Sequence, residues 1–265
     1  MAAELKAIFA EVREKKKRAA FVAYTTCGYP TIEDTVSIIL GLERGGADVI
    51  EVGVPFSDPI ADGPTIQTST HQALLNGTTF KTCLDSVREA RAQGLKAPVI
   101  FMGYYNPLLA YGEENAVRDA REAGANGFIV VDLPPEESGT FDAHCARYGM
   151  SIVPLVAPTT TDARMDMLCK RASSFVYCVA VTGVTGKRSS LPVDLTSYLA
   201  RVRSVTDLPV AVGFGISNRD HFLAVDKLAD GVVIGSAIIR QVADPGEGRT
   251  TAQAAEDFAR SITQD

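Results

Sequence analysis

Short apolar runs alternate along this chain with segments in which apolar residues recur every three or four positions. Continuous apolar runs of this length predict buried strands, and the helical spacing predicts amphipathic helices. Strands are expected at 20–24, 49–52, 98–102, 127–131, 151–155, 175–179, 209–212 and 231–234. Helices are expected at about 32–45, 65–93 with a break at Gly77, 113–123, 135–148, 161–171, 193–204, 217–227 and 250–263. One further helix before the first strand is predicted by the spacing of Leu5, Ile8, Phe9 and Val12.

This alternation predicts the fold. Strands that are apolar throughout, rather than at every second residue, are typical of a parallel sheet covered by helices on both faces. Eight strand–helix units within 265 residues predict a single (β/α)8 TIM barrel with an extra N-terminal helix. A doubly wound open sheet is the alternative, because periodicity alone does not separate the two. No Gly/Ser-rich linker or change of composition divides the chain, so we expect one domain over 1–265.

Composition narrows the function classes. A hydrophobic content of 46%, a charged content of 22% and a net charge of −6 are those of an ordinary soluble protein, and they argue against nucleic acid or a membrane as partner. The five cysteines are an odd number without a C-x-x-C pair, which indicates free thiols in a reducing compartment. No apolar run approaches the ~18 residues of a membrane span, and the N-terminus lacks the apolar core of a secretory signal. We expect a cytoplasmic protein, with a plastid as the alternative if a presequence has been removed.

Acids near strand ends are candidate catalytic groups, because chemistry in a barrel lies at the loops after the strands. Glu51 lies inside the apolar run 48–53, where a carboxyl is costly unless it is protonated, paired or functional. Asp62 follows in the proline-rich loop after that strand. Each has a structural alternative: hydroxyls or backbone groups could satisfy Glu51, and Asp62 could be a turn or helix-cap residue before Gly63. Asp132, at the end of the fourth strand, could be catalytic or could hold a neighbouring loop.

Glycine-rich turns follow the sixth, seventh and eighth strands, at 182–186, 213–217 and 235–237. Glycine lets the backbone approach a phosphate closely, and the first N–H groups of a following helix have no partner within it. The alternative is that these glycines only form tight turns, but three such turns together favour phosphate binding. The turn at 213–217 is not a dinucleotide fingerprint, because Asn218 stands where the third glycine would be.

Metal and Schiff-base chemistry are disfavoured. The three histidines, His71, His144 and His221, fall in predicted helices away from the strand ends. No H-x-H, H-E-x-x-H or carboxylate cluster is present in the sequence, so we expect no metal centre. None of the predicted strands contains the lysine that a Schiff-base aldolase would need inside the barrel.

The stretch from Glu51 to Gln67 closely resembles the signature of the tryptophan synthase α subunit family, with PFSDP, ADGP and IQ in place. Further matches follow in chain order: GYP at 28–30, YYNP at 104–107, DLPPEE at 132–137, GVTG at 183–186, GFGIS at 213–217 and GSA at 235–237. The resemblance implies a TIM-barrel lyase of tryptophan biosynthesis. It would cleave indole-3-glycerol phosphate to indole and glyceraldehyde 3-phosphate by a retro-aldol step without a cofactor. It also implies a pyridoxal-phosphate β subunit as partner, in an α2β2 heterotetramer that receives the indole.

The same resemblance implies roles for single residues. Glu51 matches the catalytic glutamate of the family, and one carboxyl with a raised pKa could both protonate indole C3 and take the proton of the glycerol hydroxyl. Asp62 matches the catalytic aspartate, which as a carboxylate would accept the indole N–H and stabilise positive charge on the ring. The matches that would bind substrate are Tyr24, Met102, Tyr104, Ile129 and Tyr177 around the indole, and Gly186, Phe214, Gly215, Gly235 and Ser236 around the phosphate, with Thr185 contacting the acidic loop on closure.

Two departures from the family pattern are present. Tyr24 stands where many members have Phe, a change that should leave stacking intact. The stretch 180–182 replaces a polar, often Arg-containing one, which bears on loop closure and on signalling to a β subunit.

Other functions stay open. A stand-alone indole-3-glycerol phosphate lyase that releases free indole would share every catalytic residue. A non-catalytic phosphate-binding barrel is less well supported, because both Glu51 and Asp62 are present. A different phosphosugar enzyme is also less well supported, because it would not need the PFSDP–ADGP loop.

Overall fold

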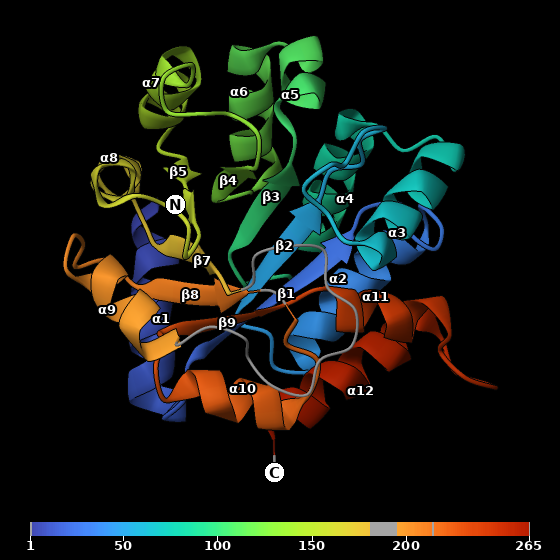
Figure 1. Cartoon of the computed structure of the whole chain (residues 1–265). Coiled ribbons are helices and arrows are strands. Elements are labelled where there is room, and N and C mark those ends of the chain that lie inside the picture. Colours follow the sequence, from blue (N-terminus) through green and yellow to red (C-terminus); the bar gives the residue numbers. More distant parts are fainter. Residues whose placement is uncertain (1, 181–194, 214, 265) are drawn as a thin grey trace.

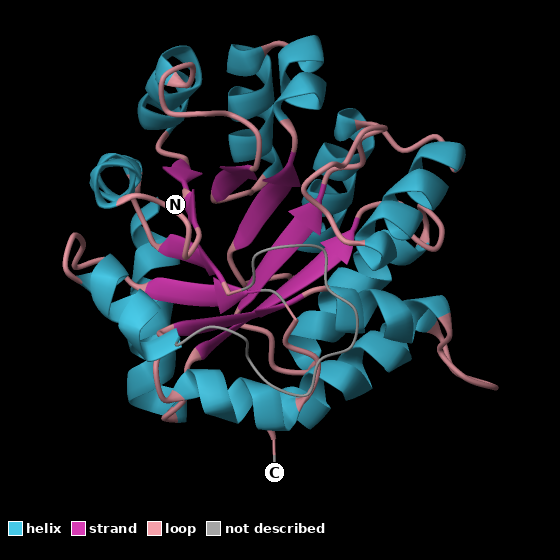
Figure 2. Cartoon of the chain, in the orientation of Figure 1, coloured by secondary structure: helices cyan, strands magenta, loops and turns pink. Residues whose placement is uncertain are grey.

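The computed structural model describes residues 2–180, 195–213 and 215–264 (Figure 1). In this part of the chain, parallel strands form the centre and helices surround them (Figure 2). The strands are β1 (Ala20–Thr26), β2 (Val49–Gly53), β3 (Val99–Gly103), β4 (Gly127–Val130), β5 (Ser151–Ile152), β6 (Leu155–Val156), β7 (Val176–Val179), β8 (Val210–Gly213) and β9 (Gly231–Ile234). The helices are α1 (Ala2–Lys16), α2 (Asp34–Arg44), α3 (Pro64–Leu75), α4 (Phe80–Ala92), α5 (Tyr105–Tyr111), α6 (Glu113–Ala123), α7 (Gly139–Tyr148), α8 (Asp162–Arg171), α9 (Leu195–Arg203), α10 (Arg219–Asp226), α11 (Ser236–Ala243) and α12 (Thr251–Thr263).

The sheet closes on itself through one interrupted strand. Its order is β5-β4-β3-β2-β1-β9-β8-β7-β6, with all pairs parallel, and the two end strands are consecutive in the chain. Between them lie only Val153, whose N–H donates to Phe128 O of β4 at 3.0 Å, and Pro154, whose carbonyl accepts from Tyr177 N–H of β7 at 3.0 Å. The segment 151–156 therefore serves as one strand for both edges. The predicted eight-stranded barrel is confirmed, and the open-sheet alternative is wrong.

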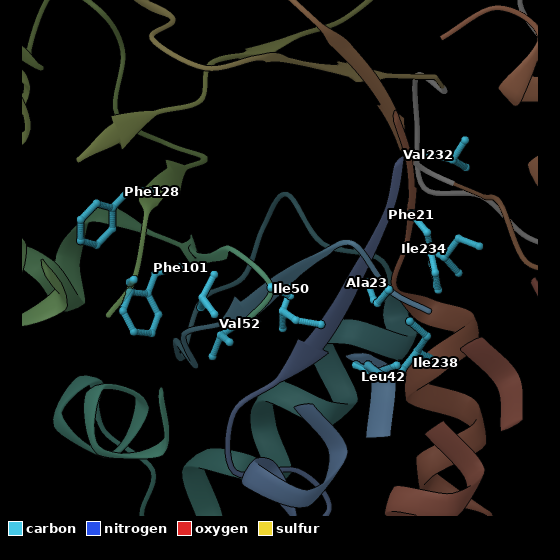
Figure 3. Packing of buried hydrophobic residues seen from close by; sticks show 14 of the residues in the cluster. Phe21, Ala23, Leu42, Ile50, Val52, Phe101, Phe128, Val232, Ile234 and Ile238 are labelled. Atoms are coloured by element: carbon cyan, nitrogen blue, oxygen red, sulfur yellow. The ribbon is translucent and has the colours of Figure 1, made fainter. Parts of the chain in front are cut away.

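Outward-pointing side chains of the strands hold the helices against the barrel. Successive residues of a strand face opposite sides, so Ala23 packs in the outer cluster while Val22 and Tyr24 face inward. In the close-up, Leu42 of α2 and Ile238 of α11 lie near Ala23 (Figure 3). This layer leaves the inner face to a separate, smaller set of residues.

The predicted N-terminal helix closes the end of the barrel at which the strands begin. Leu5, Phe9 and Val12 of α1 are buried in the interior cluster. The ring centroids of Phe9 and Phe175 are 4.9 Å apart, and a side chain at Gly231 would overlap the Phe9 ring. Because this end is filled, the space for chemistry is confined to the carboxyl ends of the strands.

Three local features differ from the expectations. The run 151–155 is not one continuous strand, because Pro154 has no N–H to donate to the ladder. The helices α5 and α11 begin directly after β3 and β9, where the sequence predicts only turns. They are 7 and 8 residues long, too short for a helical period to stand out from the apolar residues around them.

Two further expectations concern the cysteines and membrane-spanning helices. All five cysteines are free and buried, as predicted. Within the described residues, no helix is both long enough and apolar enough to cross a membrane.

Candidate active site

Glu51 lies on the inner face of β2 and is completely buried. Ile50 and Val52 pack outward in the helix-facing cluster, so the alternation of the strand turns Glu51 and Gly53 toward the barrel axis. Neither carboxyl oxygen has a hydrogen-bond partner among the described residues, which speaks against the satisfied structural acid. Burial raises the pKa of Glu51 to about 8, so the carboxyl is protonated at neutral pH.

Two tyrosines share the inner face with this acid. Tyr24 on β1 is the strand-pair neighbour of Glu51, and Tyr177 belongs to β7. Glycines make room for both hydroxyls: a Cβ at Gly53 would overlap the Tyr24 oxygen, and a Cβ at Gly213 would overlap that of Tyr177. Burial raises the pKa of both phenols far above the ordinary value, and the nearby carboxyls raise it further. Both tyrosines are therefore neutral.

Asp62 is held at the barrel mouth by Tyr104. The Tyr104 hydroxyl donates to Asp62 Oδ2 at 2.9 Å and accepts from the Ala61 N–H at 2.9 Å. The side chain of Gln67 donates to the Asp62 carbonyl at 2.8 Å. Partial burial raises the pKa of Asp62, and the hydrogen bond from Tyr104 opposes that rise. The helix-cap interpretation of Asp62 is not supported, because the N-cap of α3 is Gly63 and no side chain caps it.

A small cavity at the mouth is lined by Asp62 together with Tyr24, Met102 and Tyr104, three of the residues expected around an indole. The sequence does not single out the rest of the lining, which is Val54, Phe56, Thr70, Gly103 and Val131. Phe56 lies on the loop after β2, where one apolar residue carries no periodic signal. Its position is set by packing, because its ring centroid is 5.2 Å from that of Tyr104.

The other two residues expected around the indole lie deeper. Ile129 and Tyr177 belong to the interior cluster and do not line the cavity. Glu51 does not line it either, since its side chain is fully buried. Asp62 thus lies with Tyr24 at the cavity of the mouth, whereas Glu51 is buried deeper in the barrel. Tyr24 is next to both acids, because it also pairs with Glu51 across β1 and β2.

Residues expected to bind phosphate lie at the carboxyl ends of β8 and β9. Gly215 has a φ of +81°, which favours glycine, and the ring of Tyr24 lies against the position of the absent Cβ of Gly235. The helix α11 begins at Ser236, and its first internal hydrogen bond joins Ile239 N–H to Gly235 O at 3.0 Å. Among the described residues, no partner is seen for the preceding N–H groups of the helix, so they are available to an anion. Thr185, Gly186 and Phe214 lie outside the described residues.

Asp132 accepts a hydrogen bond from the backbone at the start of α5. Its Oδ1 accepts from the N–H of Tyr105, the first residue of α5, at 2.7 Å. This hydrogen bond favours the interpretation of Asp132 as a residue that holds a neighbouring loop. A larger cavity lies beside α7 and α8, but neither Glu51 nor Asp62 lines it.

Comparisons with known proteins find that this chain is similar to tryptophan synthases. The family model described as tryptophan synthase alpha chain matches residues 9–264. A tryptophan synthase alpha chain of Roseiflexus sp. is 45% identical over 92% of this chain and 94% of its own length. A tryptophan synthase of Saccharomyces cerevisiae is 52% identical over 94% of this chain, which spans only 35% of that relative.

Solved structures agree with the sequence relatives. A structure of Mycobacterium tuberculosis tryptophan synthase superimposes with a TM-score of 0.89 at 33% identity, covering 98% of this chain and 96% of that one. A tryptophan synthase alpha chain from Legionella pneumophila gives 0.88 at 32% identity, covering 98% and 95%.

Proposed function

The chain belongs to the tryptophan synthase alpha chain family, whose members are lyases of tryptophan biosynthesis, and we propose that it cleaves indole-3-glycerol phosphate to indole and glyceraldehyde 3-phosphate. The observation that carries the proposal is that Tyr24 adjoins three groups. They are Glu51, which has a raised pKa and no hydrogen-bond partner among the described residues, Asp62, which lines the same cavity as Tyr24, and Gly235, which precedes the N-terminus of α11. A proton donor, an acceptor for the ring and an anion site are what the reaction needs, and the scheme uses no cofactor.

Glu51 has the properties of the proton-transfer group. As a neutral acid it gives its proton to indole C3, and as the resulting carboxylate it takes the proton of the glycerol hydroxyl. The bond between indole C3 and the glycerol carbon then breaks, leaving an aldehyde. A pKa of about 8 suits both steps, because the optimal catalytic pKa lies near the working pH. Since Glu51 does not line the cavity in this state, the proposal requires its carboxyl to turn toward the mouth.

Asp62 is assigned to the indole nitrogen. Its Oδ2 is engaged by Tyr104, and Oδ1 is the oxygen that we assign to the indole N–H. A carboxylate there stabilises the positive charge that grows on the ring when C3 is protonated. Met102 and the rings of Tyr24 and Tyr104 supply the apolar walls for indole.

The phosphate is assigned to the backbone N–H of Gly215 and to the N–H groups at the start of α11. A helix N-terminus binds an anion without a lysine or arginine side chain, which fits a net charge of −6. Binding there would hold the substrate across the mouth, with its indole ring toward Tyr24 and Asp62. Thr185, Gly186 and Phe214 complete this proposed site by resemblance alone.

A β subunit is the proposed partner, in an α2β2 assembly that takes up the indole. Exposed apolar side chains on the mouth loops support an interface on this side. Ile60, in the loop after β2, is 87% exposed, and Leu109, on α5 after β3, is 51% exposed. An interface on this side would cover both side chains, and exposed apolar surface marks an interaction site where it forms a contiguous patch. We further propose a cytoplasmic location, which the five buried free thiols support.

The direct test is an assay of the purified chain with indole-3-glycerol phosphate, measuring both indole and glyceraldehyde 3-phosphate. We expect equal amounts of the two products, with a higher rate when a β subunit is added. No product under either condition would favour the non-catalytic barrel. A full rate without any response to the β subunit would favour the stand-alone lyase.

A further inference from the structure

Three hydroxyl groups form a chain of hydrogen bonds from Tyr24 to the helix that follows Asp62. The Tyr24 hydroxyl lies 3.3 Å from Thr26 Oγ1, which lies 2.8 Å from Ser69 Oγ of α3. Ser69 in turn lies 2.9 Å from the carbonyl oxygen of Ile66. Thr26 and Ser69 are 1% and 0% exposed, so bulk water does not compete for these contacts.

Each hydroxyl has one proton to donate, and this determines which group is the donor in each hydrogen bond of the chain. The Ile66 carbonyl can only accept, so the single proton of Ser69 is used there. Ser69 Oγ then accepts from Thr26, and Thr26 Oγ1 accepts from Tyr24. The reverse order would leave Ser69 Oγ and the Ile66 oxygen 2.9 Å apart with no proton between them, which buried polar groups avoid. In the order that satisfies all three contacts, the Tyr24 proton points to Thr26.

We propose that Thr26 and Ser69 are positioning residues that turn the Tyr24 proton toward Thr26 and away from Glu51, so that Tyr24 donates no hydrogen bond to that carboxyl. Tyr24 is suited to this role because it is the strand-pair neighbour of Glu51 and its hydroxyl oxygen occupies the space above Gly53, the next inward position of β2. The inference rests on the proposed role of Glu51 as the acid.

The consequence concerns which form of Glu51 the site favours. An ionised Glu51 would gain a strong hydrogen bond from a phenol that was free to donate, and this would favour the charged form. The one-way chain removes that donor, in agreement with a Glu51 carboxyl that has no hydrogen-bond partner among the described residues. It thus works in the same direction as burial, which by itself raises the pKa of Glu51.

Other titratable groups face the same region. Among the described residues they are Asp62 in the loop after β2, Tyr104 after β3 and Tyr177 on β7. The proton of Tyr104 is used by Asp62. These groups are unchanged by substitutions in the hydroxyl chain, so the orientation of Tyr24 is the variable that such substitutions alter.

The experiment is a carbon-13 NMR titration of the full chain labelled at glutamate side-chain carboxyls, with the Glu51 signal assigned by its loss in Glu51→Gln. Breaking the chain with Ser69→Ala or Thr26→Val is expected to lower the pKa of Glu51 by about one unit, the typical effect of a hydrogen bond to a charged group. Thr26→Ser keeps the hydroxyl and is expected to keep the wild-type value. Two independent chain-breaking variants guard against loss of folding in one of them.

The decisive comparison places Ser69→Ala in a Tyr24→Phe background. If Ser69 acts through the Tyr24 proton, the substitution has no further effect there. A shift that persists without the phenol, or wild-type titration of both chain-breaking variants, would overturn the proposal. The titration needs no turnover, so it separates the two proposals: a protein with the expected shifts but no indole release would refute only the proposed activity.

Discussion

Two buried acids three residues apart, Asp48 and Glu51, have opposite surroundings. Asp48, just before β2, is 4% exposed and forms ion pairs with Lys16 and Arg18. It also accepts from the Phe21 N–H at 2.8 Å. Glu51, in the middle of β2, is 0% exposed and has no partner among the described residues. Both are apolar-flanked acids in the sequence, and only their partners distinguish them.

The difference separates stability from chemistry within one strand. At Asp48 the loss of hydration is offset by two cations and a backbone donor, which tie the end of α1 and β1 to β2. At Glu51 nothing offsets it, so the carboxyl stays neutral and available for reaction. A TIM barrel is divided in the same way, because the amino ends of its strands contribute to stability and their carboxyl ends carry the catalytic residues.

Replacing the unpartnered acid tests the chemical half of this comparison. Glu51→Gln is expected to lower kcat by about 10²- to 10⁴-fold, because a neutral amide transfers no proton. Since glutamine replaces a carboxyl that is already neutral, the melting temperature should not fall. Indole release and thermal unfolding, measured on the same preparation, check both statements. Turnover near the wild-type rate would remove Glu51 from the mechanism.

Replacing the partnered acid should do the opposite. Asp48→Asn is expected to lower the free energy of unfolding by about 3 kcal/mol, because it leaves Arg18 and the Phe21 N–H without their charged acceptor. The kcat per folded molecule should stay unchanged. Urea unfolding measures the loss. Lys16→Gln is the matched control: the Lys16 side chain is 49% exposed, so this variant should lose less than about 1 kcal/mol.

The pH dependence of stability gives a third contrast. Glu51 has a pKa of about 8 in the folded chain against an ordinary value of 4.5, so between these pH values the native state binds more protons than the unfolded state. The free energy of unfolding should therefore fall as pH rises through this window, by at most about 1.4 kcal/mol per pH unit, and level off above pH 8. Urea unfolding of wild type and Glu51→Gln from pH 5 to 9 measures the difference between the two curves. Parallel curves would show that Glu51 is not a raised-pKa acid.

The sequence predicts most of the fold and only part of the site. The strands and the helices, including the N-terminal helix, follow from the period of apolar residues, which is a local property, whereas closure of the sheet through residues 151–156 is a tertiary one. The roles of Asp48, Asp62 and Asp132 depend on partners distant in the chain. For example, the Tyr104 hydroxyl that holds Asp62 is 42 residues away. Phe56 and Val131 line the cavity because of tertiary packing, and the hydroxyl chain links strand and helix residues 43 positions apart. No local pattern encodes such pairings.

Asp62 is intermediate between Asp48 and Glu51, since it is partly buried and has one side-chain partner. A substitution at that partner tests its role and has the smallest effect that we predict. Tyr104→Phe removes the hydrogen bond to Asp62 Oδ2 and is expected to lower kcat/KM about fivefold, the value of roughly one hydrogen bond. Stability should change little, because the ring stays in place. Tyr105→Phe is the matched control: its hydroxyl donates to Glu113, away from the cavity, and its loss should leave kcat/KM unchanged. Equal losses in both variants would mean that the effect is structural, whereas a loss confined to Tyr104→Phe would show that Asp62 must be held in place as well as charged.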